Sequence, residues 1–521
     1  MLPLLSACYE YKGNYVYSET EEVTVEFPEN ISAMEQMEDI VFSPKVVSSQ
    51  DGEISADNPD YEFGCLVGYT HTDAQGMTQR WYDINPEKTK DIRYPAEIPA
   101  ANYTFWYSVK NRRTGVTHNF SGNLSIISTT SEGWMVLSNN GADRRARLDI
   151  IYTDSKGQEN VRQDIRNDQS PEVFGGKQII IDPSLYSTGD LIYLVAESGG
   201  YVLNNATLLA TEGNTLKSSL FILPPRDEVA NWIGIFNAGT ASSYTSACVT
   251  SGGDAYGVWN SGGSGASFEN LLNTDVSGHA ATFHVAPFIG TSAQRPGNSY
   301  VALFYDKDNK RFVGWDRLSS QTNKLLVPLR NPAEGQLFDF ETGMDIVAMK
   351  STRFNDGDVF SVLQDNTGHR HVYGIAVNQS GSSAFRQSSV YHDITAADFD
   401  QASDYEFHSQ YPLMFYCNGG KVYSYNLATS SLRDQLNLPA GETVTMLKFN
   451  LYKQMRLTQL NNQSDEFMDM QYKLIVASTK GGENSGILRF YSIGTDGKMT
   501  LYKEYTGLGE QIVDVTYRER R

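Results

Sequence analysis

Apolar and polar residues alternate with a period of two along much of this chain, which is the spacing of a β-strand. The clearest case follows Asn102, where the residues at positions 103, 105, 107 and 109 are Tyr, Phe, Tyr and Val. The positions between them hold Thr, Trp, Ser and Lys. A polar turn at residues 111–115 and a returning strand at 116–127 complete a predicted hairpin. A strand with one apolar face predicts a sheet that packs against a second sheet.

Residues 61–69 (Tyr-Glu-Phe-Gly-Cys-Leu-Val-Gly-Tyr) predict a central strand of the same small domain. Together with the hairpin they predict a β-sandwich over residues 23–128. Residues 9–22 are mostly polar and predict a tether in front of it.

From residue 129 to residue 521 the pattern changes to short apolar strands joined by Gly, Asn and Asp turns. One unit recurs there: an apolar strand, a turn and an alternating strand rich in Tyr and Val. We find it about seven times, which is a recurrence typical of repeat folds, at residues 133–151, 191–201, 231–259, 300–315, 359–377, 412–425 and 474–493. A spacing of roughly 55 residues suits four-stranded blades, so we predict a β-propeller of about seven blades. A second array of sandwiches is the competing fold.

Composition supports the assignment of the whole chain to the all-β class. Aromatic residues make up 12%, with 31 Tyr and 24 Phe, and such side chains favour strands. At 521 residues the chain is too long for one hydrophobic core, so two or three domains are expected. The net charge of −20 argues against nucleic acid as a partner, because phosphate binding needs clustered Lys and Arg.

The amino terminus carries a short motif that predicts a lipid anchor. Leu5, Ser6 and Ala7 precede Cys8, which is the order of a bacterial lipobox. Only seven residues precede Cys8 and none is charged, so we expect residues 1–8 to be a truncated signal that begins further upstream. No other stretch of the sequence approaches the roughly 20 apolar residues of a membrane-spanning helix. We therefore predict attachment to the membrane through lipid on Cys8.

Three segments together resemble the PKD-like family of Bacteroidetes surface lipoproteins. They are residues 8–15 (Cys-Tyr-Glu-Tyr-Lys-Gly-Asn-Tyr), the predicted hairpin, and residues 132–151 with Gly-Trp-Met-Val-Leu-Ser and Ala-Arg-Leu-Asp-Ile-Ile. The hairpin is similar to the closing hairpin of immunoglobulin-type PKD domains, with Asn102 where a Gly is usual. The resemblance implies an outer-membrane, cell-surface accessory lipoprotein that works beside a SusC/SusD-type importer in nutrient uptake.

Catalytic and metal-binding motifs are weak in this sequence. His369 and His371 would share one face of a strand, and His279 and His284 lie five residues apart, but no cysteine ligand accompanies them. We therefore predict no metal site and no cofactor. A glycosidase needs two facing carboxylates, and nothing in the sequence singles out such a pair, so we name no catalytic residue.

Aromatic residues beside turns are the best binding signal that remains. Tyr256, Trp259 and Trp315 lie next to Gly-rich or polar loops, and Trp106 lies on the outer face of its strand. A flat ring there would stack on a sugar or hold a peptide, although packing inside the fold competes with this interpretation for each residue. The main hypothesis is a non-enzymatic protein that binds a glycan or peptide, or docks on the importer. The alternative is an extracellular glycan or peptide hydrolase with a propeller as its catalytic domain.

Overall fold

The computed structural model describes residues 20–69, 80–166, 169–182, 191–221, 227–237, 245–259, 268, 270–275, 280–292, 300–319, 324–377, 384–451 and 465–519. The protein is all-β, as predicted, with short helices such as α1 (Leu216–Leu220) and α3 (Asp465–Met470) between strands. No helix within the described ranges is long and apolar enough to cross a membrane. The chain forms two compact units.

Unit 1 comprises Met1–Thr129 with Asp154–Gln158, and unit 2 comprises Thr130–Thr153 with Glu159–Arg521. The sequence-based boundary between residues 128 and 129 lies one residue from this division.

Unit 1 contains three sheets among its described residues. The largest has the order β2 (Ser32–Met34), β10 (Thr117–Ile127), β9 (Ala101–Asn111), β6 (Tyr61–Tyr69) and β7 (Arg80–Asp83). The second joins β1 (Val23–Glu26), β4 (Lys45–Ser48) and β5 (Gly52–Glu53), and the third pairs β3 (Asp39–Phe42) with β8 (Ile92–Pro95). All these strand pairs are antiparallel except β2 with β10.

The predicted two faces of β9 are confirmed. Tyr103, Phe105, Tyr107 and Val109 are at most 3% exposed and lie in the core of unit 1, whereas the alternating positions 104, 106 and 110 are exposed. Phe105 meets Phe27 edge to face, with ring centroids 5.0 Å apart. The apolar face of the hairpin therefore forms the interior of this unit, as period-two alternation requires.

The packed part of unit 1 begins before β1, inside the stretch that the sequence assigns to a tether. Glu21 is 8% exposed, and its carboxylate accepts hydrogen bonds from Ser48 Oγ at 2.6 Å and from Asn111 Nδ2 at 2.7 Å. A buried carboxylate is stable only with such donors, so this residue is fixed by three separate segments of the unit.

Unit 2 contains seven sheets among its described residues. The first has the order β13 (Glu159–Arg162), β12 (Arg145–Thr153), β11 (Gly133–Asn140) and β36 (Gln511–Arg518). The other six follow in chain order: β14–β16 (Gly176–Asp182, Leu191–Ala196, Tyr201–Leu203), β17–β20 (Ala230–Asn237, Thr245–Thr250, Ala255–Trp259, Asn270–Leu271), β21–β23 (Val301–Asp306, Arg311–Asp316, Val327–Pro328), β24–β27 (Asp345–Ser351, Asp358–Gln364, Arg370–Val377, Phe385–Tyr391), β28–β31 (Asp404–Phe407, Leu413–Asn418, Lys421–Asn426, Ser431–Asn437) and β32–β35 (Thr443–Lys448, Leu474–Thr479, Gly486–Ile493, Met499–Leu508).

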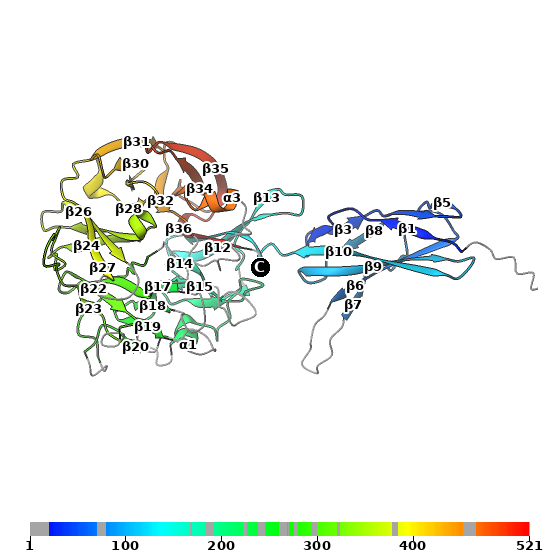
Figure 1. Ribbon diagram of the computed structural model, residues 1–521, viewed down its shortest axis with the longest axis horizontal. Helices are drawn as coiled ribbons and strands as arrows, with labels where there is room; N and C mark the ends of the chain where they lie inside the picture. Colours follow the sequence, from blue (N-terminus) through cyan, green and yellow to red (C-terminus); the bar gives the residue numbers. More distant parts are fainter. Residues whose placement is uncertain are drawn as a thin grey trace, which may run out of the picture. The chain divides into compact units, whose positions relative to one another are not determined.

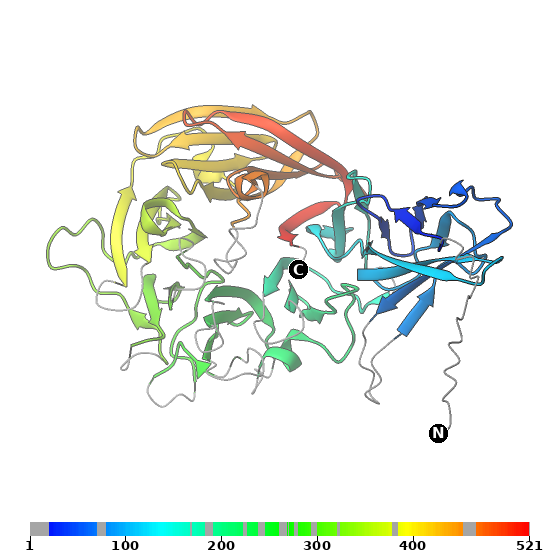
Figure 2. The ribbon, with the colours of Figure 1, turned by 45° about the vertical axis from the view of Figure 1, so that its right-hand side comes forward.

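These sheets follow one another around unit 2, from cyan through green and yellow to red (Figures 1 and 2). Each of the seven recurring units in the sequence lies in a different sheet. The first sheet combines strands from both ends of the unit, because β36 pairs antiparallel with β11 from Gly133↔Arg518 to Asn139↔Gln511. This pairing holds the last strand of unit 2 against its first strand.

Candidate ligand-binding cavity

A cavity of about 500 Å³ lies where one edge of each of the seven sheets of unit 2 meets the others. Six edges are the strands β14, β17, β24, β28, β32 and β36, and each of them is the terminal strand of its sheet. The seventh is the segment 288–291, which bridges to β21 through Gly290 and Leu303. Residues that are more than 300 positions apart in sequence, such as Ile179 and Asp514, thus line one space.

Side chains on these edge strands bind the backbone of the next edge strand. The Ile233 N–H on β17 donates to Gln178 Oε1 on β14 at 2.9 Å, and the Ile179 N–H on β14 donates to Asp514 Oδ2 on β36 at 2.9 Å. The Leu447 N–H on β32 donates to Asp404 Oδ2 on β28 at 2.8 Å. Because an edge strand has unpaired backbone donors, these polar side chains replace the missing neighbour strand.

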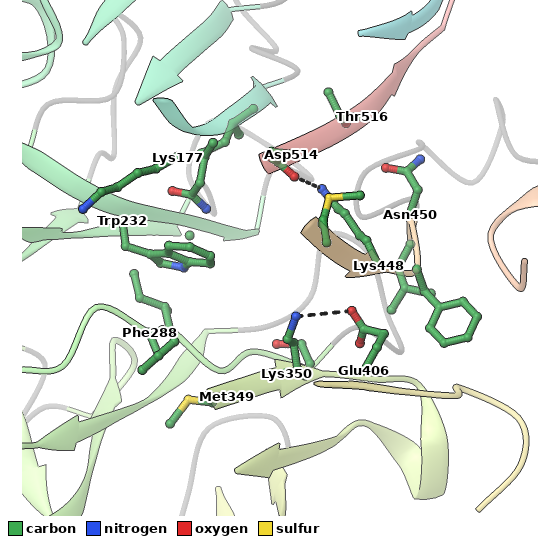
Figure 3. Close-up of a pocket in the computed structure, with 18 of the residues that line it drawn as sticks. Lys177, Trp232, Phe288, Met349, Lys350, Glu406, Lys448, Asn450, Asp514 and Thr516 are labelled. Carbon is green, nitrogen blue, oxygen red and sulfur yellow. Dashed lines mark hydrogen bonds and ion pairs between the residues drawn. The ribbon is translucent and has the colours of Figure 1, made fainter. Parts of the chain in front are cut away.

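Two groups of charged side chains form the polar wall. Lys350 Nζ on β24 lies 3.2 Å from Asp404 Oδ1 and 3.6 Å from Glu406 Oε2 on β28. Lys448 Nζ on β32 lies 2.6 Å from Asp514 Oδ1 and 2.7 Å from the Val515 carbonyl oxygen on β36. Figure 3 shows both lysines pointing toward their partners. The Lys448–Asp514 pair is balanced in charge, whereas Lys350 faces two carboxylates, and in both groups the partners lie on neighbouring sheets.

Burial and shared charge change the acidity of the Lys350 group. Burial by itself lowers the pKa of Lys350, but Asp404 and Glu406 together raise it well above the ordinary value. Burial raises the pKa of Glu406. The Lys350 ammonium offsets only part of this rise, because it is shared between two carboxylates. Lys350 therefore stays charged, and Glu406 is protonated more easily than an exposed glutamate.

An apolar wall lies beside these charges. Trp232 and Phe288 are half-buried with ring centroids 6.3 Å apart, and Met349 is 6% exposed. In Figure 3 these three side chains lie together on one side, and Lys448 and Asp514 lie on the other. A concave space with a half-buried aromatic surface and a few converging polar groups is the usual form of a small-molecule site.

A polar and partly flat ligand fits these walls. The Lys448–Asp514 pair is balanced in charge, whereas the Lys350 group holds two carboxylates for one ammonium, so an anionic ligand would add to an existing excess of negative charge. A sugar ring offers an apolar face to Trp232 and hydroxyl groups to the opposite wall, where Asn450 also lies. Within the described ranges, no cluster of three or more His, Cys, Asp or Glu side chains is arranged to hold a metal ion.

The aromatic residues chosen from the sequence occupy different environments. Trp106 is 38% exposed on unit 1. Tyr256 is half-buried and meets Phe221 edge to face at 5.2 Å, and burial raises its pKa to about 12. Trp259 is the last residue of β19, but its side chain lies outside the described residues, as does Cys8.

Trp315 requires a correction, because it is 1% exposed and belongs to the core of unit 2. Its ring lies over Gly257, where a Cβ atom would be only 2.6 Å from Trp315 Cη2. A ring enclosed in this way has no free face for a ligand. Neither Trp315 nor Tyr256 is among the described residues that line the cavity.

The cavity residues were missed from the sequence, although one signal was present. Three cavity-lining strands contain a run in which one charged residue stands among uncharged neighbours: Lys350 in Val-Ala-Met-Lys-Ser, Lys448 in Val-Thr-Met-Leu-Lys and Asp514 in Gln-Ile-Val-Asp-Val. A charge inside an apolar strand needs a buried partner or a polar cavity. That pattern identifies the inner strand of a sheet.

Comparison with known proteins supports the assignment of the amino-terminal part. Residues 8–177 match the PKD-like family, a segment that covers the described strands of unit 1 and continues into β14. No curated protein matches the chain.

Several solved structures are similar to much of the chain at low identity. A quinonprotein alcohol dehydrogenase-like protein from Bacteroides thetaiotaomicron is 13% identical, covers 92% of this chain and 97% of its own, and has a TM-score of 0.39. A DUF4784 family protein from Bacteroides caccae is 9% identical over 96% of this chain and 99% of its own, with a TM-score of 0.25. A protein of unknown function from Bacteroides caccae is 8% identical over 75% of this chain and 100% of its own, with a TM-score of 0.29.

Proposed function

We propose that this chain is a non-enzymatic glycan-binding protein, with an immunoglobulin-like sandwich as unit 1 and a seven-bladed β-propeller as unit 2. Three features support the propeller: seven consecutive sheets, one edge of each at a common cavity, and the pairing of β36 with β11. Pairing between the two ends of a propeller closes its ring and leaves only short sheet edges.

The cavity between the seven edges is the observation that carries the glycan proposal. Trp232 and Phe288 provide the flat apolar surface on which a sugar ring stacks. Lys448 and Asp514 provide charged hydrogen-bonding groups for hydroxyls on the opposite side. A volume of about 500 Å³ accommodates a short oligosaccharide rather than a folded partner.

Isothermal titration of the purified chain with a panel of neutral oligosaccharides and peptides tests this function. We expect an oligosaccharide to bind, and Trp232→Ala to weaken its affinity at least about tenfold, because stacking on the ring is lost. Tyr502→Ala is a matched control, since Tyr502 is an aromatic residue 42% exposed on the outer strand β35. Binding of peptides alone, or equal binding by the Trp232→Ala variant, would contradict the proposal.

The hydrolase alternative rests on the pair Asp404 and Glu406. The two carboxylates flank one lysine, and burial raises the pKa of Glu406, as a general acid needs. Incubation with the same oligosaccharides, followed by chromatography, separates the two functions. Product release by the natural protein would end the non-enzymatic proposal, and its loss in a Glu406→Gln variant that circular dichroism shows to be folded would support Glu406 as the acid.

The cellular setting is also part of the proposal: a lipid on Cys8, an outer-membrane and cell-surface location, and work beside a SusC/SusD-type importer. The lipobox at residues 5–8 and the PKD-like match of residues 8–177 support it. Fatty-acid labelling of the protein expressed in its native host should be lost in the Cys8→Ser variant. Pull-down from detergent-solubilised outer membranes should recover an importer, and recovery of this protein alone would contradict the partnership.

A further inference from the structure

The outer face of the five-stranded sheet in unit 1 carries three large exposed apolar side chains. Leu66 on β6 is 44% exposed, Trp81 on β7 is 48% exposed and Trp106 on β9 is 38% exposed. The strand register makes them neighbours, because Leu66 pairs with Trp106 and Gly68 pairs with Trp81. The two indole rings are 4.8 Å apart between centroids, at an angle of 65°. We call these residues, with Gly68 beneath them, the tryptophan shelf.

Gly68 holds both indole rings close to the sheet. A Cβ atom at this position would lie 2.6 Å from Trp106 Cζ3 and 2.7 Å from Trp81 Cζ3. Any side chain at position 68 would therefore displace one or both rings. Because the rings already rest on the backbone and on each other, little freedom remains to be lost when a ligand binds, and such preorganisation favours affinity.

Small uncharged residues lie beside Trp106 on the same face. Ser121 lies opposite Trp106 on β10, and Asn123 lies opposite Thr104. All three of these polar residues are exposed. Their hydroxyl and amide groups both donate and accept hydrogen bonds, as sugar hydroxyls do. The nearest acidic neighbour, Asp83, is opposite Leu66 at one corner and accepts the Asn85 N–H at 2.9 Å.

We propose that the tryptophan shelf binds a neutral polysaccharide, which lies across the sheet and stacks sugar rings on Trp81 and Trp106. Two exposed rings among uncharged hydroxyl and amide groups match a ligand with apolar ring faces and many hydroxyls. Among the described residues of this face, Asp83 is the charged neighbour of the two rings, and Glu62 pairs with Lys110 at the other end of β6 and β9, although the chain as a whole carries a charge of −20. This site lies in unit 1 and does not depend on the cavity of unit 2.

Affinity electrophoresis of the full chain through gels that contain neutral polysaccharides tests the shelf. We expect retardation by at least one polysaccharide, which the double variant Trp81→Ala/Trp106→Ala abolishes and either single variant weakens at least about fivefold. Gly68→Val should also weaken retardation strongly, although both tryptophans remain, because its side chain displaces the rings. Tyr502→Ala should leave retardation unchanged. The double variant should still bind the oligosaccharide that the cavity binds in isothermal titration, which separates this site from the cavity.

Circular dichroism and thermal unfolding of each variant show whether it is folded, and Trp81→Phe provides a second, milder change that keeps a ring at the shelf. Absence of retardation by every polysaccharide, or retardation equal in the double variant, would overturn the proposal. So would a dimer in sedimentation velocity that the double variant converts to monomer, because the shelf would then be covered by a second copy.

Discussion

Acid is expected to destabilise unit 2 through His408, which follows the last residue of β28. The ring is 2% exposed, stacks on Tyr411 at 4.8 Å and 12°, and meets Phe449 edge to face at 5.2 Å. Its Nδ1 atom accepts the N–H groups of Gln410 at 3.1 Å and Tyr411 at 3.2 Å. Protonation of Nδ1 would break both hydrogen bonds and bury a charge among aromatic rings, so the folded protein holds this histidine neutral.

The structure sets the size of the effect. Burial lowers the pKa of His408 from 6.5 to about 4. Since one pH unit of pKa difference corresponds to about 1.4 kcal/mol, the full effect is about 3 kcal/mol. Between these two pH values the unfolded chain binds a proton at this position and the folded chain does not. The stability is therefore complete above about pH 6.5, falls as the pH falls, and reaches its full loss below about pH 4.

Urea unfolding at pH 7, 5.5 and 4, followed by circular dichroism, measures this loss in the natural protein and in His408→Asn. An asparagine carbonyl can accept the same two N–H groups but does not titrate, so the other acidic groups cancel in the comparison. We expect His408→Asn to be less stable at pH 7, because the stacked ring is lost, but to lose about 3 kcal/mol less on acidification. Parallel pH profiles for the two proteins would refute the reasoning.

Three further predictions concern the stability of the buried structure. Asp149→Ala leaves Arg147, whose Nε lies 2.6 Å from Asp149 Oδ1, buried without its partner, and urea unfolding should show a loss of about 3–5 kcal/mol. The double variant Arg147→Met/Asp149→Leu should recover most of that loss, and a single variant as stable as the natural protein would contradict this. Removal of β36 deletes the partner of β11, so limited proteolysis should degrade unit 2 rapidly, and an unchanged digestion pattern would count against closure of the ring. Thiol reagents should leave Cys65, Cys248 and Cys417 unmodified until the chain is denatured, because burial raises the pKa of each thiol. Rapid labelling of these cysteines in the native protein would contradict this prediction.

The strands were predictable from the sequence because period-two alternation depends only on local neighbours. Tyr103, Phe105 and Tyr107 occupy every second position of their strand, and the structure buries all three. The seven recurring units were recognisable for the same reason, since each is a short hairpin with its own turn. The pairing of β36 with β11 carries no such local signal, because the two strands are more than 370 residues apart in the chain.

Aromatic residues beside glycine were misleading as a guide to ligand binding. Trp315 lies next to Gly314 in sequence, but the glycine that matters is Gly257 on a strand of the preceding sheet, which leaves room for the Trp315 ring in the core. At the tryptophan shelf the same chemistry occurs on an outer face, where Gly68 supports two rings that remain exposed. The two cases differ in whether the ring lies on a buried or an exposed face of its sheet, and an adjacent glycine in the sequence does not indicate which.

The polar wall of the cavity and the connections between sheets are made by the same side chains. Lys350 on β24 meets Glu406 on β28, and Lys448 on β32 meets Asp514 on β36, so each ion pair joins neighbouring sheets as it lines the cavity. Removal of one partner leaves a buried charge, which destabilises the fold as well as the site. Loss of binding in such a variant would therefore not distinguish a ligand contact from a structural one. Trp232 is an uncharged side chain, so its replacement leaves no buried charge without a partner. The aromatic wall therefore gives the cleaner test of what the cavity binds.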